Sequence, residues 1–244
     1  MNDKNDAFGI AQMMRANLYK EVHVKSDNSC ELKVLLGARN QLMASKQQIM
    51  GTVRGLLKIY GLKIPAKTPK FVAQVREAIS VLNSINVKAI ESTLPSLESV
   101  QRSIDDLDNI ISEYCKNDED CKLLMTIPGV GVITAITYKS GLDDPKRFED
   151  SDTVGAYMGP TPRQYASGEI NRQGGISKMG PKQVRTLLYE AAQSLLIVSK
   201  KNKIKRCGMK IMRKKGNKKA IVAVARKLAF VMHRMLINRT EFCC

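Results

Sequence analysis

Apolar residues recur at helical spacing along most of the chain, which predicts a mainly α-helical protein. Between Cys30 and Tyr60 they form one stripe, comprising Leu32, Leu35, Leu42, Ile49, Val53 and Leu56. This spacing is typical of a long amphipathic helix, which we expect to end near Gly61. The following segment, GLKIPAKTPK, holds two prolines and a glycine, so we expect a break there.

Two further apolar stripes follow the break and predict an antiparallel helical hairpin or a short coiled coil. The first comprises Phe71, Val75, Ala78, Leu82 and Ile85, and the second, after Pro95, comprises Leu97, Val100, Ile104, Leu107 and Ile111. Dimerisation and packing inside a monomer explain these stripes equally well.

Glycine and proline punctuate the rest of the chain, where we expect helices over 182–200 and 220–237. Between them, TPRQYASGEINRQGG, from Thr161 to Gly175, is expected to be a glycine-rich loop. The one strand candidate is YKEVHVK, Tyr19 to Lys25, which alternates over a few residues. We therefore divide the chain into segments 1–62, 63–117 and 118–244.

The net charge of +17, from 40 Lys and Arg against 23 Asp and Glu, favours a polyanionic partner such as DNA or RNA. An anionic membrane surface or a ribosome is the alternative. The segment from Lys200 to Lys219 holds eleven Lys or Arg in twenty positions, and it could be a solvated loop or a binding arm. Its candidate phosphate contacts include Arg213, Lys214 and Lys215.

The six cysteines form neither a CxxC pair nor a set with histidines at metal-ligand spacing, so we expect free thiols and no zinc site. The first residues lack the pattern of a signal peptide. Charged residues interrupt the apolar stretch from Ala220 to Ile237, so no bilayer span is expected. These features predict a soluble, cytoplasmic protein without a membrane partner.

LLMTIPGVGVITA, from Leu123 to Ala135, predicts two helices joined by a tight turn. Gly129 and Gly131 would let the backbone approach a phosphate, with amide groups of the second helix facing it. Such a helix-hairpin-helix grips a nucleic-acid backbone without reading its sequence. An ordinary helical turn is the alternative.

Ser167 is a candidate nucleophile, because it lies among glycines between Arg163 and Arg172, whose charges could offset that of a phosphate under attack. A structural role as a turn residue is the alternative. The chain has two histidines, His23 and His233, both distant in sequence, which disfavours a serine protease or esterase. Ser177 is expected to cap the helix after Pro181 or to contact phosphate. Lys178 and Lys182 are further candidate phosphate contacts.

Asp3 and Asp6 lie three residues apart at the start of an expected helix, where both carboxylates could face one Mg²⁺ ion. A pair of acids that stabilises the helix N-terminus is the more ordinary explanation.

Together, these motifs resemble a known family. LLMTIPGVGVITAI, RFEDSDTVGAYMGPTPRQYASGEINRQGGISKMGPKQVRTLLYEAA and KKAIVAVARKLAFVMHRML resemble, in that order, the C-terminal transposase domain of the insertion-sequence-110 family (the 110/116/902 group), relatives of the Piv DNA invertases. NDKNDAFGIAQMMR, VHVKS and ARNQLMASKQQIMGTVRGLLKIYGLKI resemble the end of that family's RuvC-like DEDD domain and the helix after it. The match covers nearly the whole chain.

The resemblance implies a role for each candidate. Asp3 and Asp6 match the last two acids of the DEDD set, which binds Mg²⁺, and Ser167 matches the serine that forms a transient phosphoserine link with DNA. The family recombines DNA as an oligomer guided by a structured RNA. The basic block and the coiled coil would then serve nucleic-acid contact and homo-oligomer assembly.

The chain departs from the family pattern at its start. The first Asp and the Glu of the DEDD set lie upstream of the matching motif, and Asn2 stands where Thr is usual. We therefore expect an N-terminally truncated copy, from a decayed element or a frameshifted gene, with an incomplete metal site. DNA binding is expected of such a chain, and a non-catalytic, helical nucleic-acid-binding protein is the alternative function.

Overall fold

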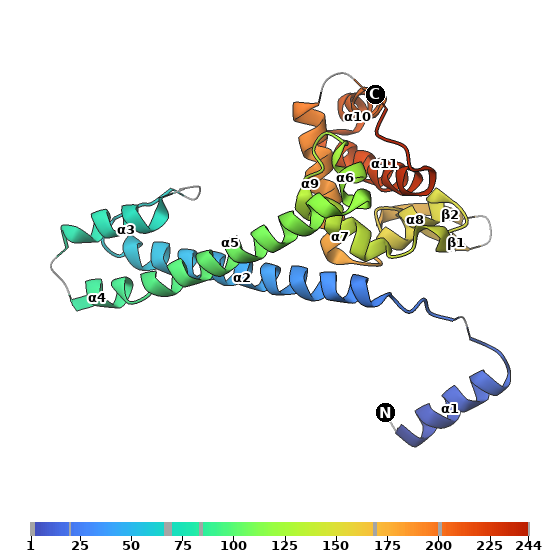
Figure 1. Ribbon diagram of the computed structural model, residues 1–244, viewed down its shortest axis with the longest axis horizontal. Helices are drawn as coiled ribbons and strands as arrows, with labels where there is room; N and C mark the ends of the chain where they lie inside the picture. Colours follow the sequence, from blue (N-terminus) through green and yellow to red (C-terminus); the bar gives the residue numbers. More distant parts are fainter. Residues whose placement is uncertain are drawn as a thin grey trace.

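The computed structural model describes residues 3–19, 21–65, 70–82, 85–167, 170–199 and 202–243, and of these 162–167 and 170–174 by their backbone alone. Figure 1 shows a long helical arm, a helical head at one end of it, and helix α1 (Asp3–Arg15) set apart beyond an extended segment. The mainly α-helical class predicted from the sequence is confirmed. The arm contains α2 (Asp27–Lys58), α3 (Phe71–Ser80), α4 (Ile85–Glu91) and α5 (Leu94–Asn117). The head contains α6 (Glu119–Met125), α7 (Val132–Leu142), the 3-10 turn η1 (Pro145–Arg147), α8 (Ser151–Met158), β1 (Pro162–Ser167), β2 (Ile170–Ile176), α9 (Lys182–Val198), α10 (Lys203–Lys215) and α11 (Asn217–Asn238).

Helix α2 contributes to two separate hydrophobic cores. Ser26 caps the helix, because its hydroxyl accepts a hydrogen bond from the Ser29 N–H group. Its buried apolar residues are Leu32 and Leu36 in the head core and Met50, Val53 and Leu57 in the arm core. At about 1.5 Å per residue the helix is about 48 Å long, so it spans the distance between the two cores.

Helix α5 runs antiparallel to α2. Its register is fixed by three polar pairs, Asn28–Tyr114, Arg39–Asp108 and Lys46–Gln101. The stripe at 97–111 therefore packs mainly on α2, and the expected hairpin with the 71–85 stripe is wrong. The reason is length, since α2 offers an apolar face along the whole of α5, whereas α3 has ten residues and covers one end.

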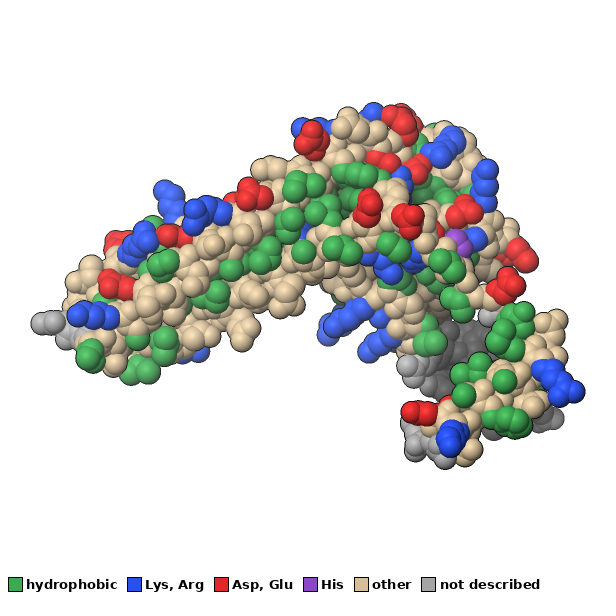
Figure 2. All heavy atoms as spheres, turned by 60° about the horizontal axis from the view of Figure 1, so that its bottom comes forward, with side chains coloured by type: hydrophobic (Ala, Val, Ile, Leu, Met, Phe, Trp, Pro, Cys, Tyr) green, Lys and Arg blue, Asp and Glu red, His purple; other side chains and the backbone are tan. Residues whose placement is uncertain are grey.

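The arm keeps apolar side chains on its surface. Figure 2 shows hydrophobic side chains along the length of the arm, and Val34 and Ile110 are 74% and 53% exposed. At its far end, Phe71, Val75 and Ile79 of α3 close the arm core, and the Arg54 guanidinium lies 4.8 Å from the centre of the Phe71 ring. Dimerisation through the arm and the boundaries at 62 and 117 stay predictions.

The head core forms where α7, α9 and α11 meet. The Tyr138 hydroxyl, on α7, donates a 2.6 Å hydrogen bond to the Ala229 carbonyl of α11. Gly141 brings α7 so close to α9 that a Cβ atom there would lie 2.7 Å from a Val184 methyl carbon. In the part of the chain that the structure describes, no helix is long and apolar enough to cross a membrane.

The segment expected to form a strand adopts neither strand nor helix between 21 and 26. Two of its alternating side chains, His23 and Lys25, form hydrogen bonds at the C-terminal end of α7. The Lys25 ammonium group donates to the Ser140 and Gly141 carbonyl oxygens, where the negative end of the helix dipole attracts a cation. Burial lowers the pKa of Lys25 to about 8, and the charge of Lys33 adds to this effect.

Asp143 completes the junction between α2 and α7. Its carboxylate accepts hydrogen bonds from the Ser26 N–H and hydroxyl groups and from the His23 ring, the last at 2.6 Å. Burial alone would raise the pKa of the Asp143 carboxyl, but these hydrogen bonds outweigh burial and hold it well below its ordinary value. The residue has φ of 68°, which sequence patterns did not reveal.

Acidification is expected to weaken this junction. Because the pKa of Asp143 is lower in the folded chain, its contribution is present above the unfolded value, about 4, and is lost as pH falls toward the folded one. Urea unfolding at pH 7 and pH 2.5 should show a loss of about 1–3 kcal/mol in unfolding free energy from this group. Asp143→Asn should reduce the pH dependence, and an unchanged dependence would contradict the assignment.

Candidate nucleic-acid interface

The segment expected to be a glycine-rich loop forms an antiparallel β-hairpin at the edge of the head (Figure 1). Ser167 is opposite Ile170 and Tyr165 is opposite Arg172. The loop prediction is wrong because each strand satisfies its backbone groups through the other, which needs no apolar alternation. Ser167 is the last residue of β1.

The side chains of Arg163, Ser167 and Arg172 lie outside the described part of the structure. Their backbone positions place all three on this hairpin. Whether the two guanidinium groups approach the serine hydroxyl therefore stays a prediction.

Two Met-Gly-Pro sequences, 158–160 and 179–181, meet at the base of the hairpin. Gly159 and Gly180 have φ of 80° and 76°, and a Cβ atom on Gly159 or Gly180 would lie well inside 3.0 Å of the carbonyl oxygen of Met179 or Tyr157, respectively. We call the two facing segments, 157–161 and 177–181, the glycine clasp.

Hydrogen bonds close the clasp. The Ser177 N–H group donates to the Thr161 carbonyl at 2.7 Å, and the Lys178 N–H group donates to the Gly159 carbonyl at 3.3 Å. The Ser177 hydroxyl also lies 3.4 Å from that Gly159 oxygen, while Pro181 occupies the capping position of α9. The predicted cap by Ser177 is therefore wrong. Lys178 and Lys182, beside the clasp, are exposed.

The Pro-Gly-Val-Gly turn joins α6 and α7 as the sequence predicted. Gly129, with φ of 91°, lies against α9, where a Cβ atom would be 2.8 Å from the Ala191 carbonyl oxygen. The close backbone contact that Gly129 allows is therefore with α9, inside the head. Gly131 caps α7 and has open space around it, so the first turn of α7 stays accessible. Contact with phosphate through this turn stays a prediction.

The described part of the basic block forms α10 and the start of α11, so its interpretation as a loop is wrong. Asn202 caps α10 by accepting a hydrogen bond from the Lys205 N–H group. Ile204 is buried, and Gly208 lies so close to its neighbours that a Cβ atom would be 2.6 Å from a Leu196 methyl carbon of α9. The face that carries Ile204 and Gly208 thus packs on the head, and most of the basic side chains of α10 are exposed to solvent.

Five cations gather where α10 turns into α11. This cationic tip comprises the exposed residues Arg213, Lys214, Lys215, Lys218 and Lys219. No ion pair engages any of them among the described residues. Lys205 differs, because its ammonium group donates to the Ile197 and Ser199 carbonyl oxygens at the end of α9.

The tip is electrostatically unbalanced. Arg213 to Lys215 lie in the last turn of α10, where cations complement the helix dipole. Lys218 and Lys219 lie in the first turn of α11, which has no acidic residue and no capping side chain. Cations at this positive end of a helix are unfavourable by about 0.3–1 kcal/mol each, so the tip favours an anionic partner.

Comparison with known proteins shows a similarity to transposases. Residues 121–208 match the transposase IS116/IS110/IS902 family. The whole chain aligns, at 29% identity over 250 residues, with 68% of the transposase for insertion sequence element IS1111A of Coxiella burnetii.

Residues 121–208 thus resemble the IS116/IS110/IS902 family of transposases, and relatives that are transposases align with the chain beyond those residues. The transposase for element IS1328 of Yersinia enterocolitica is 24% identical, over 79% of this chain and 59% of the relative. The pilin gene-inverting protein of Moraxella bovis is 25% identical, over 98% of this chain and 67% of the relative.

The family-matched residues contain most of the site described above. They run from α6 through the Pro-Gly-Val-Gly turn, α7, α8, the hairpin, the glycine clasp and α9 to the middle of α10. The cationic tip lies just after them.

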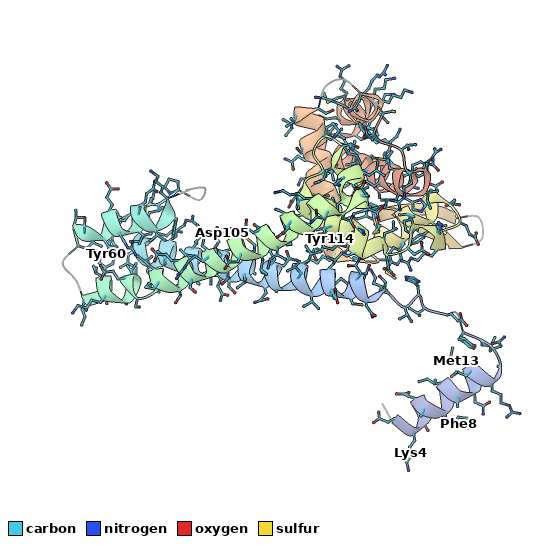
Figure 3. The ribbon with its side chains drawn as sticks, in the orientation of Figure 1. Lys4, Phe8, Met13, Tyr60, Asp105 and Tyr114 are labelled. Atoms are coloured by element: carbon cyan, nitrogen blue, oxygen red, sulfur yellow. The ribbon has the colours of Figure 1, made fainter. Side chains whose placement is uncertain are left out.

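Asp3 and Asp6 lie on α1, as the sequence predicted, and every described residue of this helix is exposed. Figure 3 labels Lys4, Phe8 and Met13 on α1, far from the head. Searched over the described ranges, the structure holds no group of three or more His, Cys, Asp or Glu residues that could bind a metal ion. The two carboxylates therefore do not form a complete magnesium site with the residues described here.

One serine–histidine pair escaped the sequence analysis because its members are 82 positions apart. The Ser151 hydroxyl lies 2.9 Å from Nδ1 of His233, and Nε2 of that ring donates to the Pro145 carbonyl at 2.9 Å. The second acceptor is a backbone carbonyl instead of a carboxylate, and His233 is buried. The pair fastens η1 and α8 to α11.

Proposed function

We propose that this chain acts in the transposition of an insertion sequence, by binding duplex DNA and cutting a strand with the Ser167 hydroxyl. The observation that carries this proposal is the family match over the residues that form the hairpin, its clasp and the surrounding helices. The relatives named as transposases and as a gene-inverting protein support DNA as the substrate.

In the proposed step, the Ser167 hydroxyl gives its proton to solvent water as its oxygen bonds to phosphorus. The bond from phosphorus to the departing strand breaks, and the departing oxygen takes a proton. Arg163 and Arg172 would offset the charge that develops on the phosphate. Both histidines are hydrogen-bonded to other residues, His23 to Asp143 and His233 to Ser151, and neither is assigned as the acceptor of the serine proton.

We assign roles to the other segments of the chain from the same similarity to transposases. Segment 118–244 would be the transposase domain, with the Pro-Gly-Val-Gly turn as a helix-hairpin-helix contact to the DNA backbone. Segment 1–62 would be the end of a RuvC-like domain, and the arm would join copies of the chain into a homo-oligomer. A structured guide RNA would be the second polyanion that the charge of +17 attracts.

Magnesium would belong to a site that Asp3 and Asp6 share with ligands beyond the described residues. No step of the proposed cleavage is assigned to it here. As a second function, the exposed cations of the tip favour a non-catalytic role in which the chain binds nucleic acid without cutting it.

Duplex DNA should bind the wild-type chain with strong salt dependence. Five phosphate contacts from the cationic tip predict a log–log slope of about −4.5, so affinity should fall about 500-fold between 50 and 200 mM salt. Fluorescence anisotropy with a labelled duplex measures this slope. Indifference to both duplex DNA and structured RNA at 50 mM salt, with binding to anionic vesicles, would rule out the proposed function.

A further inference from the structure

We propose that the glycine clasp sets the direction in which the hairpin holds Ser167, and that Gly159, Gly180 and Arg185 are positioning residues for strand cleavage. The role in cleavage rests on the function proposed above. The role in orientation rests on the geometry of the clasp alone.

The clasp joins backbone to backbone. Gly159 faces the Met179 carbonyl and Gly180 faces the Tyr157 carbonyl, so each segment fits the other reciprocally. Both positions demand glycine for two reasons, the positive φ and the absence of room for a Cβ atom. Because the two segments leave no space between them, the strands that continue from them leave the head at a fixed separation and angle.

Arg185 connects the clasp to a rigid element. From the first turn of α9, its Nη1 atom donates to the Met179 carbonyl at 2.7 Å and to the Gly180 carbonyl at 2.8 Å. The same helix buries Val184 and Leu188 in the head core. The clasp therefore cannot turn without breaking these hydrogen bonds or moving α9.

A small rotation at the clasp would produce a larger displacement of Ser167, because the hairpin extends from the clasp. In the described sheet the two strands pair only with each other, and such a two-stranded ribbon is marginal by itself. Ser167 lies six residues from Thr161, which is about 20 Å along a strand. A rotation of about 10° at the clasp would move it by about 3.5 Å, whereas reacting groups must be placed within about 0.5 Å.

The test compares alanine substitutions that differ in their surroundings. Gly159→Ala and Gly180→Ala should each raise hydrogen exchange of the β1 and β2 amides and slow formation of a covalent Ser167–DNA adduct at least about tenfold. Affinity for duplex DNA should stay within about twofold, because the cationic tip is unchanged. Gly175→Ala, in β2, is the matched control, because nothing lies within 4 Å of a Cβ atom there and its φ is not positive.

Substitutions of Arg185 provide a second, independent test. Arg185→Ala should behave like the clasp variants, and Arg185→Lys should recover part of the adduct rate, because an ammonium group can still donate to a carbonyl. Urea unfolding of each variant separates local from global effects. Loss of DNA affinity in parallel with adduct rate would mean general unfolding and would overturn the proposal.

Two failures are distinguishable. Hydrogen exchange in Gly159→Ala equal to that in wild type and Gly175→Ala would overturn the clasp while leaving the proposed function intact. These adduct assays contain, as a separate polypeptide, the part of the IS1111A transposase that lies outside the alignment. A wild-type chain that binds DNA there but forms no Ser167 adduct would overturn the cleavage role of the serine and, with it, that of the clasp.

Discussion

Replacing the five cations of the tip by glutamine is expected to weaken binding to duplex DNA about a hundredfold at 0.1 M salt and to flatten its salt dependence. Each phosphate contact releases counterions and adds about 0.9 to the slope, so losing five should reduce it by about 4.5. Fluorescence anisotropy across 50–300 mM salt measures both quantities.

The substitutions should leave the fold intact. The tip residues are exposed, and α10 is held to the head by Ile204 and Gly208 on its other face. Replacing Lys218 and Lys219 by glutamine, at the positive end of the α11 dipole, should slightly stabilise the chain in the absence of DNA. Thermal unfolding checks this expectation.

A charge-matched variant of the arm is the control. It replaces five exposed lysines by glutamine: Lys58, Lys63, Lys70, Lys88 and Lys116. Both variants have the same net charge, so a purely global attraction would weaken binding equally in both. An equal loss in the two variants would show that the tip is not the binding surface.

Ser167→Ala is expected to abolish strand exchange, with a loss of at least about 10³-fold, because the hydroxyl oxygen is the atom proposed to bond to phosphorus. The assay supplies, as a separate polypeptide, the part of the IS1111A transposase that the alignment leaves uncovered. DNA affinity should stay within about twofold, since the cationic tip is unaltered.

Ser151→Ala is the matched control for this prediction. It removes the hydroxyl of the serine that lies beside a histidine, and so tests the alternative nucleophile within the same head. Strand exchange should persist in this variant. The reverse outcome, with activity kept in Ser167→Ala and lost in Ser151→Ala, would transfer the nucleophile to Ser151.

The sequence predicted the long helices because each has an apolar face of its own. The stripe from Cys30 to Tyr60 became α2, and the stretch from Ala220 to Ile237 became most of α11. The partner of α5 could not be predicted, because several stripes offered similar apolar faces and length decided among them.

Other features depend on contacts between distant residues. In α10, basic residues dominate the sequence and obscure the apolar positions. The sequence also does not indicate that Gly208 packs against Leu196 and Val224. The hairpin lacks alternating apolar residues, and its clasp depends on two glycines 21 positions apart. Asp143 has a positive φ, and its carboxylate binds His23 and Ser26, which are distant in the sequence.

The candidate site was predicted in part. The helical setting of Asp3 and Asp6 and the exposure of Arg213 to Lys215 agree with the sequence analysis. Gly129 packs against α9. The sequence motif alone could not show whether this glycine allows close packing or contact with a phosphate. The role of Ser167 and the magnesium site stay predictions.

The most direct test is to map a covalent link between the protein and DNA. The wild-type chain is incubated with a nicked duplex of a relative's element end and the complementing polypeptide, quenched in denaturant, and digested for mass spectrometry. We predict a nucleotide attached through phosphate to Ser167. Attachment to any other residue, or bound DNA without attachment under conditions that support strand exchange, would contradict the account.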